Sequence, residues 1–441
     1  MHSDRAEASH SDGPNAMNRR KFCASVCAGG VAAALAGCAG RPRLPIAAKV
    51  VVIGGGCGGA TAAKYLRLWS NHSVDVLLIE PNAEFVSSPL SNRVIDGELQ
   101  LGQLTSSYES LRRRHGVRIV QDRATSIDPD KRVVTLAGGG TVHYDELVLS
   151  PGIDSMFETV DGLAQAHADG RILQSWSAGP DTVALRAQLA AMRDGGVFVI
   201  TVPESPYRCP PAPYERATLV AAFFQQYKAK SKVLVLDANQ DVTAMGALFK
   251  RAWSELYAGT LEYRNHYRVT AVDAKSLTAR FEVQEDVRAD VLNVLPSVRA
   301  GALACDSGLA NINARWCEVN FASFESTVAK HVYILGDAVQ AAPMMPKSGH
   351  MANGHAKVAA AAILAALQGR PVDPEPVLTN TCYSFMSPTE AVHAAAVYQY
   401  DVMLSTFKPV AGTSGASATR SPLEASYAMG WARNLWADML G

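Results

Sequence analysis

The sequence has no excess of charge of either sign. Its 441 residues include 41 Lys and Arg and 41 Asp and Glu, and the longest basic block is the three arginines at 112–114. Nucleic acid is therefore not an expected partner, because surfaces that bind it concentrate basic residues. The sequence also lacks a run of about 20 apolar residues, the length that a membrane-spanning helix requires.

A Cys-x-x-Cys-His motif is absent as well, which excludes covalent attachment of a c-type haem to this chain. Charged residues make up only 19% of the sequence and hydrophobic residues 48%, the balance of a well-packed globular protein. The length exceeds what one ordinary hydrophobic core holds, so two or three domains are expected.

A glycine-rich turn separates an expected strand at 50–53 from an expected helix at 61–68. The glycines of this turn are Gly54, Gly56 and Gly59. A second apolar strand, at 74–79, ends at Glu80. This pattern predicts a site for an adenine dinucleotide, with the pyrophosphate at the helix N-terminus and the ribose hydroxyls at Glu80.

The N-terminal 45 residues predict export. An arginine pair, Arg19 and Arg20, precedes Phe22 and a short apolar stretch at 23–36, which is typical of a secretory signal. The adjacent arginines resemble a twin-arginine signal. The segment 35–38 resembles a lipobox, which would make Cys38 a lipid anchor; the alternative is cleavage with Cys38 unmodified. We expect a periplasmic protein with residues 1–45 as signal and linker.

The middle of the chain repeats the strand and helix outline without the glycines. The expected elements are a helix at 183–192, a strand at 197–201, a helix at 218–227 and a strand at 232–236. A proline-rich loop at 203–215 stands where phosphate-binding glycines would lie. Because proline has no N–H and is too bulky for close approach, this unit is not expected to bind a nicotinamide nucleotide.

An apolar strand at 331–335 leads into Gly336 and Asp337. Together with the glycine turn, this pair resembles the second FAD signature of flavoproteins with two dinucleotide domains, in which the aspartate contacts the ribityl chain. The segment 346–349 then leads into a long alanine-rich helix, whose N-terminus would face the flavin. The candidate cofactor-binding residues are Gly54, Gly56, Gly59, Glu80, Ser88, Asn92, Pro151, Gly152, Gly336, Asp337, Lys347, Ser348 and Gly349.

Five of the eight cysteines lie beyond the expected signal. They are Cys57, Cys209, Cys305, Cys317 and Cys382. Export permits disulfides, but an odd number leaves at least one thiol unpaired. Cys209 lies in the proline-rich loop after an expected strand, where a catalytic group would be displayed. The alternative for Cys209 and Cys382 is a buried thiol or a structural bridge.

Six segments together resemble the flavoprotein subunit of flavocytochrome c sulfide dehydrogenase. They are 52–56, 89–92, 208–216, 336–337, 345–349 and 378–383. The resemblance covers the chain from about Lys49 to the C-terminus. It implies bound FAD, a redox disulfide between Cys209 and Cys382, and Glu215 as a nearby acid. Sulfide would open the disulfide to give a persulfide, and the Cys382 thiolate would pass electrons through the flavin to haem c on a cytochrome subunit.

The implied fold class is α/β, with two Rossmann-like dinucleotide-binding domains. The FAD-binding domain is expected at 46–154 and 305–372. A second Rossmann-like domain without a nucleotide loop is expected at 155–304, and a C-terminal region at 373–441 would carry Cys382 and the surface for the cytochrome subunit.

The sequence departs from the family pattern in two ways. Ser88 stands where the family often has a cysteine bonded to the flavin, so FAD is expected to be bound without a covalent link. Three histidines, His350, His355 and His393, stand near methionines, which makes copper a candidate ligand; the alternative is that they are ordinary surface histidines.

Other functions remain open at this point. Sulfide:quinone oxidoreductase shares the fold and the cysteines, and the amphipathic tail at 423–440 could serve a membrane surface. A lipid-anchored flavin electron carrier without its own turnover is a further alternative, against which the two cysteines argue. A nicotinamide-disulfide reductase is disfavoured, because the second unit lacks its glycine loop.

Overall fold

The computed structural model describes residues 48–441. The predicted export signal and Cys38 lie outside the described residues. A seven-stranded sheet organises the first unit, in the order β19-β20-β21-β9-β1-β2-β5. Its strands are β19 (Val319–Asn320), β20 (Glu325–Ser326), β21 (Val332–Ile334), β9 (Glu146–Leu149), β1 (Lys49–Ile53), β2 (Asp75–Ile79) and β5 (Arg118–Val120). From β21 to β5 neighbouring strands are parallel, and β19 and β20 form an antiparallel edge.

The centre of this sheet is buried on both faces. Val50, Val51 and Val52 of β1 have no exposed surface, as expected of parallel strands with continuous apolar sequence. Two helices, α2 (Cys57–Trp69) and α10 (Gly349–Leu367), pack against each other. Their small residues allow this close contact, and α10 starts where the sequence predicts it.

Smaller elements extend the first unit. The strands β6 (Ala124–Asp128), β7 (Val133–Leu136) and β8 (Thr141–His143) form an antiparallel meander. The sequence of 82–92 lacks period-two alternation and contains Pro89, which predicts a loop. The segment instead contains β3 (Glu84–Val86), because these residues pair with β4 (Thr105–Ser107). Further elements are α3 (Asn92–Ile95), η1 (Leu101–Leu104), α4 (Glu109–His115), α9 (Ala302–Asp306) and η3 (Gly336–Ala338).

The second unit contains a parallel four-stranded sheet in the order β13-β12-β11-β17. Its strands are β13 (Leu261–Arg264), β12 (Lys232–Asp237), β11 (Val197–Val202) and β17 (Val291–Val294), and its helices are α5 (Leu163–Ala168), α6 (Pro180–Ala191), α7 (Ala212–Tyr227) and α8 (Gly246–Leu256). The prediction of an α/β fold with two Rossmann-like units is confirmed. Helix α7 starts six residues before the expected 218, since the prolines before it stand where no helical N–H is needed.

Short strands accompany this unit. They are β10 (Ile153–Ser155), β14 (Val269–Asp273), β15 (Thr278–Phe281), β16 (Val287–Arg288) and β18 (Val298–Ala300), with the single turn η2 (Phe157–Thr159). Strands β14, β15 and β16 form an antiparallel sheet, and β10 pairs with β18.

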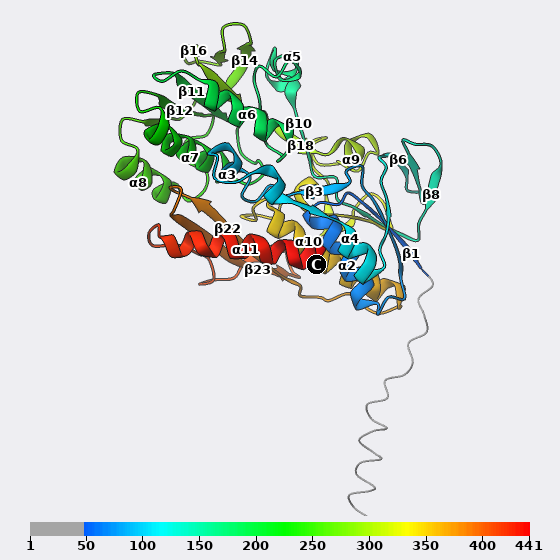
Figure 1. Ribbon diagram of the computed structural model, residues 1–441. Helices are drawn as coiled ribbons and strands as arrows, with labels where there is room; N and C mark the ends of the chain where they lie inside the picture. Colours follow the sequence, from blue (N-terminus) through cyan, green and yellow to red (C-terminus); the bar gives the residue numbers. More distant parts are fainter. Residues whose placement is uncertain (1–47) are drawn as a thin grey trace, which may run out of the picture. The chain divides into compact units, whose positions relative to one another are not determined.

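The C-terminal region is an antiparallel sheet with a covering helix. Its elements are β22 (Val377–Phe385), β23 (Ala391–Asp401), β24 (Thr406–Pro409), β25 (Gly415–Ala416) and α11 (Pro422–Leu440). Figure 1 shows α11, in red, beside β22 and β23. Cys382 therefore lies within strand β22. Among residues 48–441, no helix has the length and apolar character needed to cross a membrane.

Candidate functional site

A cavity of about 780 Å³ opens at the carboxyl ends of β1, β2, β9 and β21. Parallel sheets bind their ligands at this edge, and the volume suits a large cofactor. Most of the predicted cofactor-binding residues line it. They are Gly54, Gly56, Glu80, Ser88, Pro151, Gly152, Gly336, Asp337 and Gly349.

The glycines of the turn have different physical roles. A Cβ on Gly59 would lie 1.8 Å from the carbonyl oxygen of Gly54, so only glycine lets α2 pack against the turn. A Cβ on Gly56 would meet no atom within 4 Å. Because Gly56 lines the cavity, a side chain there would occupy the space intended for a pyrophosphate. Glu80 lies beside the turn, where its Oε2 accepts a 2.6 Å hydrogen bond from the Gly55 N–H.

Asp337 carries an unsatisfied atom that fits a cofactor hydroxyl. Its Oδ1 is buried and has no hydrogen-bond partner within the described residues, while its Oδ2 lies 3.5 Å from Nε of Arg208. A buried carboxylate oxygen without a donor is costly unless a ligand supplies one. A ribityl hydroxyl is such a donor, so the residues lining the cavity fit FAD.

Four of the predicted cofactor-binding residues do not line this cavity: Gly59, Asn92, Lys347 and Ser348. Asn92 instead contacts Glu215. The ammonium group of Lys347 donates a 2.9 Å hydrogen bond to the carbonyl oxygen of Asp337 and lies 3.7 Å from the centre of the Trp316 ring. Burial lowers the pKa of Lys347 to about 8. The side chains of Asn92, Lys347 and Ser348 support the residues that line the cavity and do not line it themselves. Their polar atoms are already bonded within the protein.

Both candidate redox cysteines are linked to one segment, Lys347 and Ser348 at the start of α10: Cys209 directly and Cys382 through Asn380. The N–H of Cys209 donates a 2.8 Å hydrogen bond to the carbonyl oxygen of Lys347. Ser348 Oγ donates a 2.7 Å hydrogen bond to Oδ1 of Asn380, and Nδ2 of Asn380 lies 3.3 Å from Sγ of Cys382. This segment leads into Gly349, which lines the cavity, as does Arg208.

Both sulfur atoms are free thiols in the structure, so a disulfide between them stays a prediction. Burial raises the pKa of Cys209, and the charge of a Cys382 thiolate raises it further. The two thiols are therefore close enough to interact electrostatically. Each of the two cysteine residues keeps part of its surface exposed.

Glu215 lies in the first turn of α7 and is held at both carboxyl oxygens. Its Oε1 accepts a 2.8 Å hydrogen bond from the N–H of Phe385, and its Oε2 accepts a 2.7 Å bond from Nδ2 of Asn92. Burial raises the pKa of Glu215. Its charge in turn raises the pKa values of Cys209 and Cys382. Glu215 is therefore an acid placed near both sulfur atoms, as the resemblance implies.

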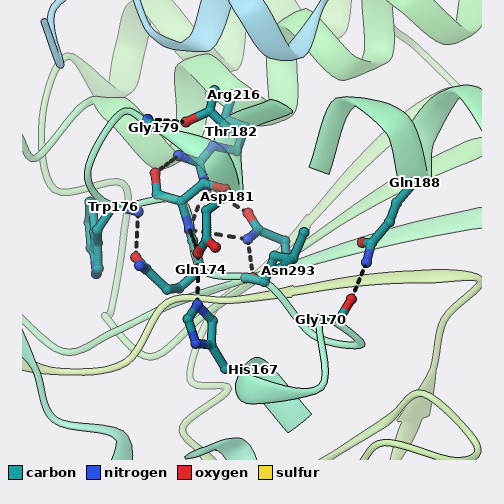
Figure 2. Close-up of polar contacts among 12 residues, drawn as sticks. His167, Gly170, Gln174, Trp176, Gly179, Asp181, Thr182, Gln188, Arg216 and Asn293 are labelled. Atoms are coloured by element: carbon teal, nitrogen blue, oxygen red, sulfur yellow. Dashed lines mark hydrogen bonds and ion pairs between the residues drawn. The ribbon is translucent and has the colours of Figure 1, made fainter. Parts of the chain in front are cut away.

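Arg216, the next residue of α7, is buried, and Figure 2 shows it with its partners Gln174 and Asn293. Its NH1 donates to the carbonyl oxygen of Gln174 at 2.9 Å and to Oδ1 of Asn293 at 2.8 Å. Its Nε donates to Oδ1 of Asn92 at 3.2 Å. Burial lowers the pKa of Arg216 to about 10. Because Asn92 is thus held by Arg216, its amide group is directed at Glu215.

The three histidines proposed as copper ligands do not come together in the structure. Within the described residues, no three His, Cys, Asp or Glu side chains are grouped to hold a metal ion. His355 is buried and stacks on Phe324 at 4.2 Å between ring centres, and burial lowers its pKa to about 3. Nδ1 of His350 accepts the N–H of Thr381, and His393 contacts Glu424. Each histidine therefore has its own protein partner.

In the second unit, tyrosine side chains contact the acid at the end of β12, where a nucleotide ribose would bind. Asp237 ends β12 and is fully buried. Its Oδ2 accepts hydrogen bonds from the hydroxyl groups of Tyr214, at 2.7 Å, and Tyr263, at 3.0 Å. Unlike Glu80, which lines the cavity of the first unit, Asp237 has no exposed surface that a ribose could reach.

Two residues of the site were missed by the sequence analysis. Arg208 received no role, although it is adjacent to Cys209, and it both lines the cavity and contacts Asp337. Asn380 is two residues before Cys382, so on a strand both side chains lie on one face. Recognising 377–385 as a strand would have indicated this contact.

Comparison with known proteins shows similarity along most of the chain. Residues 182–296 match the family model "Sulfide dehydrogenase (flavocytochrome c) flavoprotein chain, central". Residues 374–440 match "Flavocytochrome c sulphide dehydrogenase, flavin-binding", and residues 48–181 match "Pyridine nucleotide-disulphide oxidoreductase".

Individual relatives agree with these matches. The flavoprotein chain of sulfide dehydrogenase (flavocytochrome c) from Chlorobaculum thiosulfatiphilum is 54% identical over 46 residues, which cover 10% of this chain and 94% of that sequence. Mitochondrial sulfide:quinone oxidoreductase from Dictyostelium discoideum is 23% identical over 305 residues, covering 67% of this chain and 66% of the relative, slightly less than two thirds. The crystal structure of sulfide:quinone oxidoreductase from Aquifex aeolicus has the same fold, with a TM-score of 0.75 at 20% identity over 89% of this chain and 92% of that one.

Proposed function

Because the chain belongs to the family of flavocytochrome c sulfide dehydrogenase flavoprotein chains, we propose that it oxidises sulfide with FAD and passes the electrons to a c-type cytochrome subunit. One observation carries this proposal. Cys209 bonds directly to the Lys347 and Ser348 segment, and Cys382 is linked to it through Asn380, beside the cavity that fits FAD.

The substrate chemistry takes place on the two sulfur atoms. Hydrosulfide attacks Sγ of Cys209 in a Cys209–Cys382 disulfide, so that the bond between the cysteines breaks and a Cys209 persulfide and a Cys382 thiolate form. A second hydrosulfide then takes the outer persulfide sulfur as HS–SH and leaves a Cys209 thiolate. The two thiolates re-form the disulfide and release two electrons.

Bound FAD supplies the acceptor for these two electrons. The chain would hold it through the open space at Gly56, the free Oδ1 of Asp337 and the carboxylate of Glu80. Arg208 would stay beside both Asp337 and Cys209. Its positive charge lowers the pKa of Cys209 against the opposing effect of burial, which favours the thiolate form that the reaction uses.

Glu215 would donate and accept protons at the cysteine sulfur atoms. Its raised pKa allows it to hold a proton at the pH at which an exposed glutamate is ionised. It would donate this proton when negative charge accumulates on the sulfur atoms and accept it again when the disulfide re-forms. Asn92 and the Phe385 N–H keep its carboxyl group in place.

FAD would be held without a covalent bond, because Ser88 lines the cavity where a cysteine would be needed for one. Acid or heat denaturation followed by centrifugation should leave yellow FAD in the supernatant. A fluorescent flavin band that remains with the polypeptide on a denaturing gel would contradict this.

Export to the periplasm by the arginine-pair signal, with or without a lipid at Cys38, remains part of the proposal. It is supported by the sequence at 19–38. Fractionation of cells should find the protein outside the cytoplasm. Replacement of both Arg19 and Arg20 by lysine should retain it inside.

Quinone is the second candidate acceptor. The similarity to sulfide:quinone oxidoreductases in sequence and fold favours it.

The decisive experiment for the leading proposal is purification of the native protein, followed by sulfide titration under anaerobic conditions. Loss of flavin absorbance near 450 nm on adding sulfide, with haem c reduced in a co-purifying subunit, is the expected result. Flavin that stays oxidised in sulfide would overturn the proposal.

A further inference from the structure

A chain of hydrogen bonds connects the N-terminus of α10 to the sulfur of Cys382. The N–H of Met351 donates to Oγ of Ser348 at 3.1 Å, which makes Ser348 the N-cap of the helix. Ser348 Oγ donates onward to Oδ1 of Asn380 at 2.7 Å. Nδ2 of Asn380 then lies 3.3 Å from Sγ of Cys382.

The direction of this chain follows from donor and acceptor chemistry. Ser348 uses an oxygen lone pair for Met351, so its single proton is free to be donated to the oxygen of Asn380. The amide nitrogen of Asn380 is thereby directed at Cys382. A flipped amide would put an oxygen against the sulfur, which would be repulsive once the sulfur carries a negative charge.

We infer that Asn380 stabilises the thiolate of Cys382 through its amide N–H, with Ser348 as the residue that fixes the direction of that amide. This inference rests on the proposed function and assigns the two sulfur atoms different parts in it. Cys382 is the leaving group when the disulfide opens, because a stabilised thiolate leaves faster. Cys209 is the sulfur that hydrosulfide attacks, and within residues 48–441 no side chain donates a hydrogen bond to it.

The surroundings of Cys382 make this contact important. Burial opposes its ionisation, and so does the charge of Glu215 from α7. Cys209 faces it from the loop before α7, and Tyr398 faces it from β23. His350 of α10 is nearby, since its Nδ1 accepts the N–H of Thr381, and its lowered pKa keeps it neutral. The amide of Asn380 offsets these effects most, and the Ser348 hydroxyl lowers the pKa of Cys382 to a smaller extent.

The test is the titration of one thiol in FAD-loaded, reduced protein with Cys209→Ser. The alkylation rate of the Cys382 peptide by iodoacetamide, followed by mass spectrometry across pH 6–10, gives its pKa directly. Asn380→Leu should raise this pKa by about one unit or more, since a hydrogen bond to a charged group is lost. Ser348→Ala should give a smaller rise, because the amide can then rotate.

The matched control is Thr379→Val, the neighbouring residue on the opposite, exposed face of β22. It should leave the pKa of Cys382 unchanged. An unchanged pKa in Asn380→Leu with normal FAD content would overturn the inference. If Asn380→Leu does not fold, an unchanged pKa in Ser348→Ala decides against the inference equally. This readout needs no turnover, so absence of sulfide oxidation in the native protein would reject the proposed function and leave the thiol titration unaffected.

Discussion

The backbone N–H of Cys209 donates a 2.8 Å hydrogen bond to the carbonyl oxygen of Lys347. These residues are far apart in the sequence and belong to the two different Rossmann-like units. The bond joins the proline-rich loop after β11 to the start of α10. The second unit therefore brings Cys209, next to the cavity-lining Arg208, to the start of α10.

Replacement of either candidate redox cysteine should abolish sulfide oxidation. Cys209→Ser and Cys382→Ser each remove one half of the disulfide, so kcat/KM should fall by about 10³-fold or more, as on loss of a covalent nucleophile. FAD content should stay near one per chain. Cys305→Ser is the control and should keep full turnover. Activity within tenfold of the unmodified protein in Cys382→Ser would reject the disulfide mechanism.

Two neighbouring glycines should respond to substitution in opposite ways. Gly56→Val places its side chain in open space, so folding should be normal while FAD occupancy falls strongly. Gly59→Ala forces a Cβ against the carbonyl oxygen of Gly54, and the free energy of unfolding should fall by about 3 kcal/mol or more. Flavin absorbance per protein and thermal unfolding of the FAD-free chains separate the two effects. Equal FAD loss at unchanged stability in both variants would contradict this assignment.

The ionisation of Glu215 should make stability depend on pH. Below pH 4.5, its ordinary pKa, the carboxyl group is protonated in both the folded and the unfolded chain. As the pH rises, the unfolded chain ionises first, because burial raises the folded pKa, and stability is lost. The thermal midpoint of the unmodified protein should therefore fall relative to Glu215→Gln between pH 4.5 and 8. Glu285→Gln, at an exposed position, should show no such divergence. Parallel curves for all three proteins would show that Glu215 is not protonated in the fold.

Nicotinamide nucleotides should not reduce the flavin. The loop at 203–211 offers prolines in place of glycines, and Asp237 is already bonded to Tyr214 and Tyr263. Anaerobic NADH or NADPH at millimolar concentration should leave the absorbance near 450 nm unchanged over minutes, whereas dithionite should bleach it. Rapid bleaching by NADH would mean that the second unit still binds a nucleotide.

Cytochrome c should be a better acceptor than a soluble quinone. The family models that match residues 182–296 and 374–440 carry the name flavocytochrome c, and the proposed partner is a haem-bearing subunit. Steady-state assays with sulfide should reduce cytochrome c at least tenfold faster than decylubiquinone. The reverse preference would favour the quinone candidate.

The fold and half of the site could be predicted from local sequence. Three parts of the site each depend on a few adjacent residues with a specific backbone conformation. They are the glycine turn, Glu80, and the pair of Gly336 and Asp337. These residues gather at one cavity because parallel strands place their carboxyl ends on one edge of the sheet. The strands and helices followed from apolar periodicity, with errors at 84–86 and at the start of α7, where strand pairing and proline placement decided the outcome.

Only the tertiary structure decided which polar groups meet. Asn92 was expected at the cofactor, and its amide points to Glu215, because Arg216 from another unit holds its oxygen. Asn380 and Ser348 meet because β22 lies beside α10, which no local pattern indicates. The sequence by itself determined the elements and the dinucleotide cavity, since these depend on backbone conformation and apolar spacing. The electrostatic setting of the two sulfur atoms depends on contacts between residues far apart in the chain, and only folding specifies those contacts.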